Sequence, residues 1–87
     1  MKTLINELRA EILATEKQVQ NLKLMITTAD LSSRPDLPEG TPAADRGEMV
    51  ANSMLAYRHL EDARMRLGKV IQAYDGGVSV YDRKAAP

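Results

Sequence analysis

A short stretch of this chain is crowded with basic side chains and contains only two acidic ones. The basic residues between positions 58 and 69 are Arg58, Arg64, Arg66 and Lys69. Arg66 and Lys69 would project from nearly the same face of a helix, and Gly68 between them removes bulk where a ligand could approach. Such a pair offers charge-assisted hydrogen bonds to a small anion. The alternative is a solvated helix face on which Glu61 and Asp62 act as salt-bridge partners.

His59 is the one histidine of the sequence and could meet Asp62 across a helical turn as a metal pair. Because the chain has no cysteine and no further histidine, we expect no metal site and an exposed or interface histidine instead. The sequence also lacks a glycine-rich phosphate loop and a nucleophile–histidine–acid arrangement. We therefore expect a protein that is not an enzyme and has no cofactor.

The composition indicates one small domain that gains stability by oligomerisation. A chain of 87 residues buries only a modest fraction of its surface. Its 12 basic and 12 acidic residues balance, which disfavours general binding to DNA. The absence of cysteine and of any long apolar run indicates a cytoplasmic protein with no signal peptide and no membrane span.

The first part of the chain has the pattern of a heptad helix. Apolar residues alternate three and four apart, with a single polar interruption, at Ile5, Leu8, Ile12, Thr15, Val19, Leu22 and Ile26. This spacing predicts a helix over about 3–27 with Thr3 as its N-cap. Prolines and glycine then predict a loop over about 29–44, which is either functional or a plain connector.

A second helix is predicted over about 45–75. It begins either at Thr41–Pro42 or, as we favour, at Asp45, which forms a capping-box pattern with Glu48. Gly76–Gly77 ends it. Its apolar stripe consists of Ala56, Leu60, Ala63, Leu67, Val70 and Tyr74.

These elements predict an all-α fold: an antiparallel two-helix hairpin forming a single domain over 1–87, with a tail over 76–87. The alternation in Val78–Tyr81 predicts a short extended segment in that tail. Met54, Leu55 and Met65 lie off the stripe that the hairpin can bury, so we expect them to drive assembly into a homo-oligomer.

The segment HLEDARMRLGKVIQA, together with the upstream NELRA and the trailing DGGVSVY, resembles the anti-CBASS sponges of bacteriophages. These are small helical-hairpin proteins that bind cyclic-oligonucleotide immune signals, and they are related to the Thoeris anti-defence sponges. The resemblance covers both helices and the tail. It implies a homohexamer that sequesters cyclic dinucleotides, and in many members cyclic trinucleotides in a second kind of pocket, without cleaving them.

The resemblance also implies the site residues. A basic residue in a motif like NEIKA contacts the cyclic dinucleotide in the family, and Arg9 occupies that place, with Asn6 and Ser79 beside it and Tyr74 or Tyr81 stacking on a base. A basic residue late in the second helix gathers around the trinucleotide phosphates, and Lys69 matches it, with Arg66 one turn before and His59 nearby.

From these observations we expect a cyclic-nucleotide sponge acting in the cytoplasm of an infected bacterium. A structural coiled-coil module without a small-molecule ligand is the alternative, because the heptad pattern of the first helix is sufficient for it. Cysteine-free, neutral composition is compatible with both.

Overall fold

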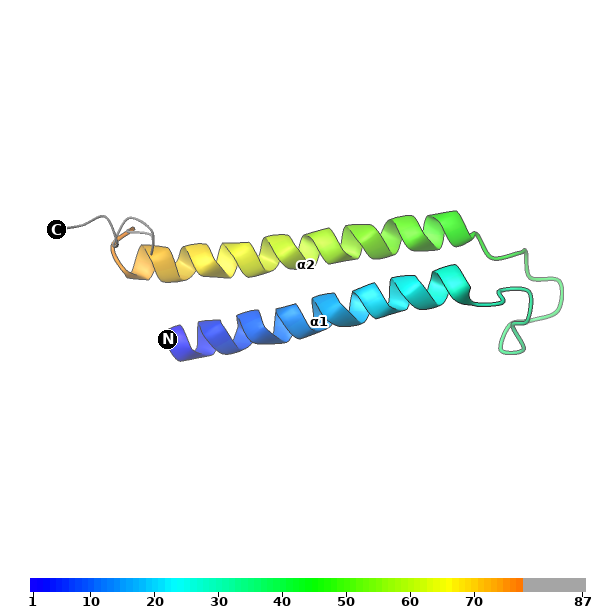
Figure 1. Cartoon of the computed structure of the whole chain (residues 1–87), viewed down its shortest axis with the longest axis horizontal. Helices are drawn as coiled ribbons and strands as arrows, with labels where there is room; N and C mark the ends of the chain where they lie inside the picture. The colour runs from blue at the N-terminus through cyan, green and yellow to red at the C-terminus, as the bar shows by residue number, and fades with distance from the viewer. Residues whose placement is uncertain (78–87) are drawn as a thin grey trace.

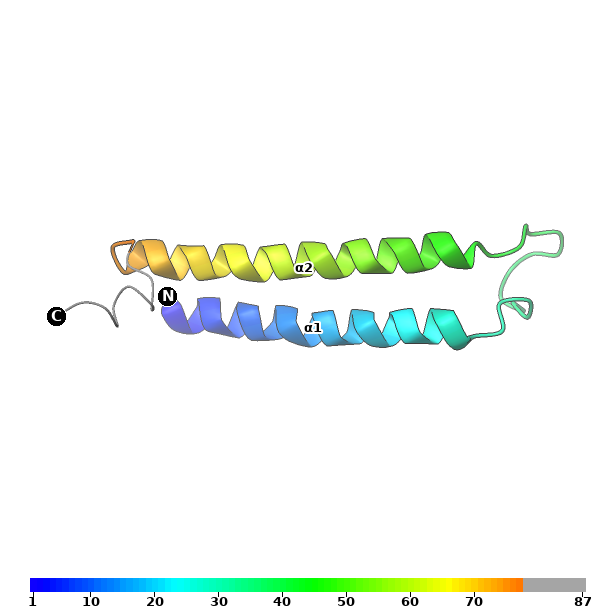
Figure 2. The same ribbon diagram turned by 45° about the horizontal axis from the view of Figure 1, so that its top comes forward.

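The chain forms two long antiparallel helices joined by a loop, as a computed structural model that describes residues 1–77 shows (Figure 1). Helix α1 spans Lys2–Thr28 and helix α2 spans Arg46–Tyr74. At about 1.5 Å per residue they are about 40 Å and about 44 Å long. Figure 2 shows that they stay side by side when the view is turned.

The predicted all-α hairpin is confirmed, and residues 1–77 contain no strand. The extended segment predicted at Val78–Tyr81 lies outside the described residues. Neither helix is long and apolar enough to cross a membrane.

Three of the four helix ends lie close to the positions predicted from the sequence. Asp45 is the N-cap of α2, and its carboxylate accepts a hydrogen bond from the backbone N–H of Glu48 at 3.0 Å. Gly76 and Gly77 end α2 with φ angles of 81° and 84°, in the left-handed region that favours glycine. The start of α1 differs, because Met1 is the N-cap without a side-chain bond and Thr3 lies inside the helix.

The loop between the helices is held by two arginines. Arg46 donates hydrogen bonds to the carbonyl oxygens of Ile26 and of Ala29, the latter at 2.8 Å, and so satisfies acceptors that the end of α1 leaves open. Arg34 donates to the carbonyl of Pro42 at 2.7 Å. Hydrogen bonds from the Ser32 side chain and backbone lower the pKa of Asp30 below its usual value. The connector is therefore structured by its own polar contacts.

The side of α1 that faces α2 differs from the predicted seam. Its buried and half-buried residues are Ile5, Arg9, Ile12, Glu16, Val19, Lys23 and Ile26. Ile5, Ile12, Val19 and Ile26 belong to the predicted seam and do face α2. The other members of that seam, Leu8, Thr15 and Leu22, are exposed. The charged residues that follow them in sequence take their place, so the centre of the contact surface on α1 is rotated by about 50°, half the angle between neighbouring residues.

The stripe predicted for α2 is corrected in the same way. Leu60 and Leu67 face α1, but Ala56, Ala63, Val70 and Tyr74 are exposed. The residues that complete the contact with α1 are Val50, Ser53, Tyr57, Arg64 and Ile71. In both helices the residue that follows the predicted one in sequence faces the partner helix; on α2 these residues are Tyr57, Arg64 and Ile71.

The hairpin consequently has a very small apolar core. Among the described residues, Ile5 and Ile26 are the fully buried apolar side chains, each 6% exposed. Glu16 is more deeply buried than either, at 1% exposed. A two-helix unit with so little apolar burial gains little stability from its core, so its polar contacts matter more than usual.

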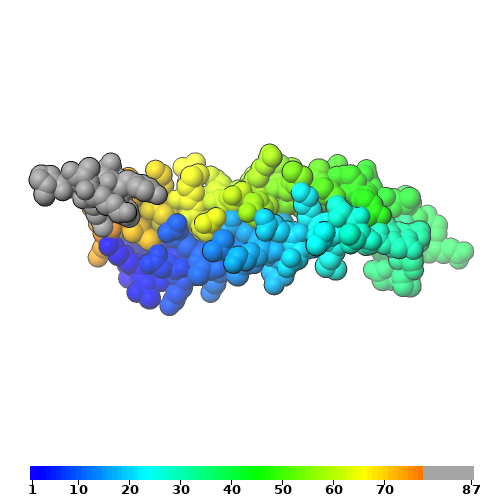
Figure 3. Space-filling model, in the orientation of Figure 1, coloured from blue at the N-terminus to red at the C-terminus, as the bar shows by residue number. Residues whose placement is uncertain are grey.

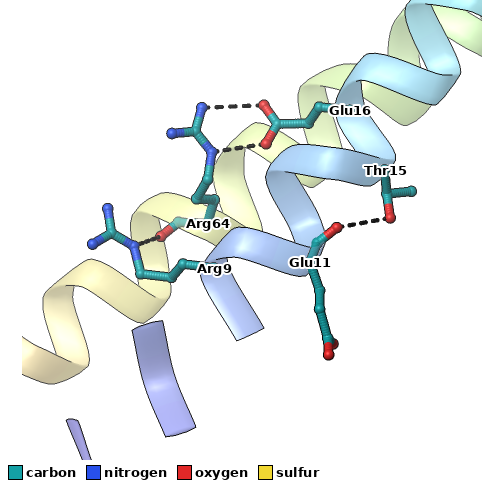
Figure 4. Close-up of polar contacts among 5 residues, drawn as sticks. All are labelled: Arg9, Glu11, Thr15, Glu16 and Arg64. Atoms are coloured by element: carbon teal, nitrogen blue, oxygen red, sulfur yellow. Dashed lines mark hydrogen bonds and ion pairs between the residues drawn. The ribbon is translucent and has the colours of Figure 1, made fainter. Parts of the chain in front are cut away.

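The buried Glu16 carboxylate is matched by Arg64 on the other helix. The Arg64 guanidinium donates from Nε to Glu16 Oε2 at 2.7 Å and from Nη2 to Oε1 at 3.1 Å, a bidentate contact that Figure 4 shows. This hydrogen bonding raises the pKa of Arg64 above its ordinary value. A charged pair inside a seam favours the one helix alignment that brings the two charges together.

We predict that this pair determines helix alignment more than stability. Glu16→Leu alone should lower the thermal unfolding midpoint by several degrees, because Arg64 then faces an apolar seam without a carboxylate. Glu16→Leu combined with Arg64→Leu should return the midpoint to the wild-type value or above it. Circular dichroism at matched protein concentration measures both, with Glu11→Leu on the exposed side of α1 as the control. A double variant that unfolds as early as the single one would contradict this role.

Candidate functional site

The Arg9 side chain lies against α2 at Gly68, the glycine in the middle of the second half of that helix. Its Nε donates to the backbone carbonyl of Arg64 at 3.3 Å (Figure 4). A Cβ placed on Gly68 would lie 3.4 Å from Arg9 Nη2 and 3.5 Å from Cζ, so the guanidinium rests against the glycine. The helix–helix contact therefore fixes the Arg9 side chain and leaves its terminal nitrogens without a carboxylate partner among residues 1–77.

Arg9 forms part of an open groove of about 550 Å³, which we call the basic groove. Its lining residues are Arg9, Arg58, Glu61, Asp62, Arg64 and Met65. Arg64 is neutralised by Glu16, and Asp62 also pairs with Arg66 at 3.8 Å. Arg9 and Arg58 are the two groove cations that no described carboxylate pairs with. Guanidinium groups in this state offer planar, bidentate donors to a phosphate.

The other residues expected to contact a cyclic dinucleotide lie toward the same end of the hairpin or outside the described part. Asn6 is exposed on α1. The ring of Tyr74 is exposed on α2, with Lys2 Nζ 5.6 Å from its centroid. Lys2 also pairs with Asp75 at 2.6 Å, which ties the start of α1 to the end of α2. Ser79 and Tyr81 lie outside the described residues.

The residues expected to contact a cyclic trinucleotide lie apart from the basic groove. His59, Arg66 and Lys69 are all exposed on α2 and do not line the groove. The Arg66 side chain is 76% exposed and pairs with Asp62 within its own helix. One hairpin does not bring these three side chains together with Arg9, so any shared pocket requires other copies of the chain.

Sequence reasoning left Arg58 and Arg64 out of the expected ligand sites, although both line the groove beside Arg9. Arg64 had a detectable signal, because it falls between Leu60 and Leu67 at heptad spacing and so belongs to the seam. No sequence pattern indicated Arg58, since it comes close to Arg9 only when the two helices pack.

A second surface, which we call the apolar face, borders the helix–helix seam on the side opposite the basic groove. Each of its residues directly precedes a seam residue on its own helix, and in an antiparallel pair these positions lie on one side. They are Leu8, Leu22, Met49, Ala56, Ala63 and Val70. All are exposed, with Leu22 at 48% and Val70 at 46%. An apolar surface that runs along both helices is typical of a protein–protein contact.

Large apolar side chains are exposed on other sides of the hairpin as well. Met54, Leu55 and Met65, which the sequence placed off the buried stripe, are all exposed. Figure 3 shows the side chains of the two helices meeting along the length of the hairpin. Burial of Met54, Leu55 and Met65 requires a further copy or another partner.

No group of three or more potential metal ligands occurs in the part of the chain that the structure describes. Near His59 and Asp62, the side-chain contact recorded for Asp62 is the ion pair with Arg66.

We predict that the apolar face mediates self-association. Leu22→Asp should lower the oligomeric state while helicity is retained, because a carboxylate would have to be buried without a partner. Asn21→Asp introduces the same charge one residue away on an exposed position and should leave the oligomeric state unchanged. Sedimentation velocity distinguishes the two, and equal sedimentation of wild type and Leu22→Asp would contradict the assignment.

We further predict that Gly68→Ala stabilises the hairpin. Alanine is better than glycine inside a helix by about 1 kcal/mol, and the new Cβ would meet Arg9 only at ordinary van der Waals distance. Gly68→Leu should instead lower stability, because its larger side chain would displace the guanidinium. Chemical denaturation measures both changes, and a destabilised Gly68→Ala variant would show that Arg9 needs more room than this geometry indicates.

Comparison of the chain with protein-family models, with curated proteins and with solved structures finds no match. The basic groove and the apolar face are therefore the features on which a function can be based.

Proposed function

We propose that this chain is a non-enzymatic sponge that assembles as a homo-oligomer through its apolar face and sequesters cyclic dinucleotides. By lowering the free messenger it would block CBASS-type anti-phage signalling in the host cytoplasm. The observation that carries the proposal is the Arg9 guanidinium, which α2 positions while its terminal nitrogens lack a described acidic partner.

The geometry around Arg9 suits a phosphate. A flexible arginine loses side-chain entropy when it binds, but the Arg64 carbonyl and the space over Gly68 already hold this one in place. Arg58 on the rim of the groove supplies a second cation. A positioned Arg9 with Arg58 beside it favours a ligand that carries more than one phosphate, which is the charge pattern of a cyclic dinucleotide.

Symmetry connects this ligand to the assembly. A cyclic dinucleotide has two equivalent halves, and a contact between two identical hairpins related by a two-fold axis presents two copies of Arg9 to it. The exposed ring of Tyr74 lies toward the same end of the hairpin and could stack on a base. The hexamer that the resemblance implies would contain several such two-fold contacts.

A second pocket for cyclic trinucleotides is part of the proposal. His59, Arg66 and Lys69 are exposed on α2, where a three-fold axis would bring three copies of each together. Converging cations repel unless an anion lies among them, and three phosphates would neutralise them. Arg66 could exchange its exposed pairing with Asp62 for a phosphate at little cost.

The chemistry of the groove favours binding over hydrolysis. Its donors toward a ligand are guanidiniums, which can hold a phosphodiester and stabilise its charge. Two carboxylates, Glu61 and Asp62, also line the groove, and Asp62 pairs with Arg66. Neither carboxylate has a catalytic role in the proposed sponge.

A structural coiled-coil module without a ligand is the second candidate. The heptad contact between α1 and α2 and the exposed Leu8 and Leu22 favour it, because together they account for a self-associating protein without any ligand. A coiled-coil module assigns no role to the position of Arg9 over Gly68, and we therefore rank this function second.

We predict that Arg9→Gln weakens cyclic dinucleotide binding by about 100-fold or more, the effect of losing one charge-assisted hydrogen bond from each of two protomers. Lys17→Gln, on the exposed side of the same helix, should leave the affinity unchanged. Isothermal titration calorimetry measures both, and heating a loaded complex should return the intact ligand on chromatography. Equal affinity of wild type and Arg9→Gln, or recovery of linear product in more than stoichiometric amount, would contradict the proposal.

A further inference from the structure

A second cleft lies between the helices toward the loop end of the hairpin. It has a volume of about 250 Å³, and residues of both helices line it, among them Val19, Lys23, Ser53, Met54, Tyr57 and Arg58. Lys23 is about 21 Å along α1 from Arg9, at about 1.5 Å per residue. Arg58 and Glu61 border both this cleft and the basic groove, but Arg9 does not line the cleft.

Lys23 is the unusual residue of this cleft. It occupies a seam position and is half-buried, yet no carboxylate among residues 1–77 pairs with it. The neighbouring Ser53 is buried, and its hydroxyl donates to the Val50 carbonyl at 2.8 Å, so that hydroxyl proton is already engaged. Lys23 therefore brings a positive charge to the cleft without a paired carboxylate, and an anion bound there would supply the counter-ion.

The remaining walls suit a flat apolar group. Tyr57 contributes a half-buried aromatic ring, and Val19 and Met54 contribute apolar surface from the two helices. Arg58 adds a second cation, against Glu61 as the one carboxylate among the lining residues. The volume is slightly below the range of about 300–1,000 Å³ that is usual for drug-sized ligands, so the occupant is a small molecule.

We propose that this cleft binds an aromatic ring that carries one phosphate, the chemistry of a nucleoside monophosphate. The phosphate contacts Lys23 and Arg58, and the ring packs against Tyr57 between Val19 and Met54. The site is independent of Arg9 and does not rest on the proposed binding of cyclic dinucleotides.

The test is calorimetric titration of the full chain with adenosine 5′-monophosphate, with adenosine, and with inorganic phosphate. Because the cleft recognises both the ring and the charge, the monophosphate should bind at least about tenfold more tightly than either of the other two. Lys23→Gln should weaken monophosphate binding by about tenfold or more, and Lys23→Arg should restore most of it. Lys17→Gln and Arg9→Gln should leave it unchanged.

Folding of each variant is checked by circular dichroism, and Arg58→Gln on the exposed rim provides a second loss of charge should Lys23→Gln unfold the hairpin. The proposal is overturned if the monophosphate binds no more tightly than inorganic phosphate, if no binding is measured, or if Arg9→Gln abolishes it. Failure of the Lys23 test would leave the Arg9 prediction intact, since Lys23 lines only the cleft and Arg9 lines only the basic groove, while Arg58 borders both.

Discussion

A carboxylate buried between two helices requires a cation beside it, and in this hairpin Glu16 has Arg64. The pair lies within the seam, so any sliding or rotation of one helix against the other would separate the two charges. It also places α2 against the charged side of α1, where Arg9 reaches the Arg64 carbonyl and Lys23 borders the second cleft. The polar contact thus determines which side chains are available for ligands.

The same arrangement leaves the protein with apolar surface to cover. Because three of the seven α1 contact residues are charged, Leu8 and Leu22 remain exposed beside the seam, and Met49 and Val70 continue that surface on α2. A hairpin with two fully buried apolar residues in its described part gains little stability alone. The proposed self-association and anion binding would then be complementary, since one would cover the apolar face and the other would neutralise the cations of the opposite side.

The parts of this fold that depend on local sequence could be predicted. Asp45 caps α2 and Gly76 helps to end it because capping is decided within a few residues. The face that α1 turns to α2 could not be predicted, because Ile5 and its heptad equivalents have an apolar row on one side and a charged row on the other. Which row is used depends on Arg64, 48 positions further along the chain from Glu16. Likewise, nothing near Arg9 in sequence indicates that it will rest over Gly68.

The central claim is that one hairpin is incomplete and that its ligand lies between symmetric copies. Native mass spectrometry of the full chain, with and without a cyclic dinucleotide, tests this most directly because it gives the number of subunits and of bound ligands together. We predict an oligomer with an even number of subunits that binds one dinucleotide for every two protomers. A monomer, or an oligomer that binds no cyclic dinucleotide, would contradict the account.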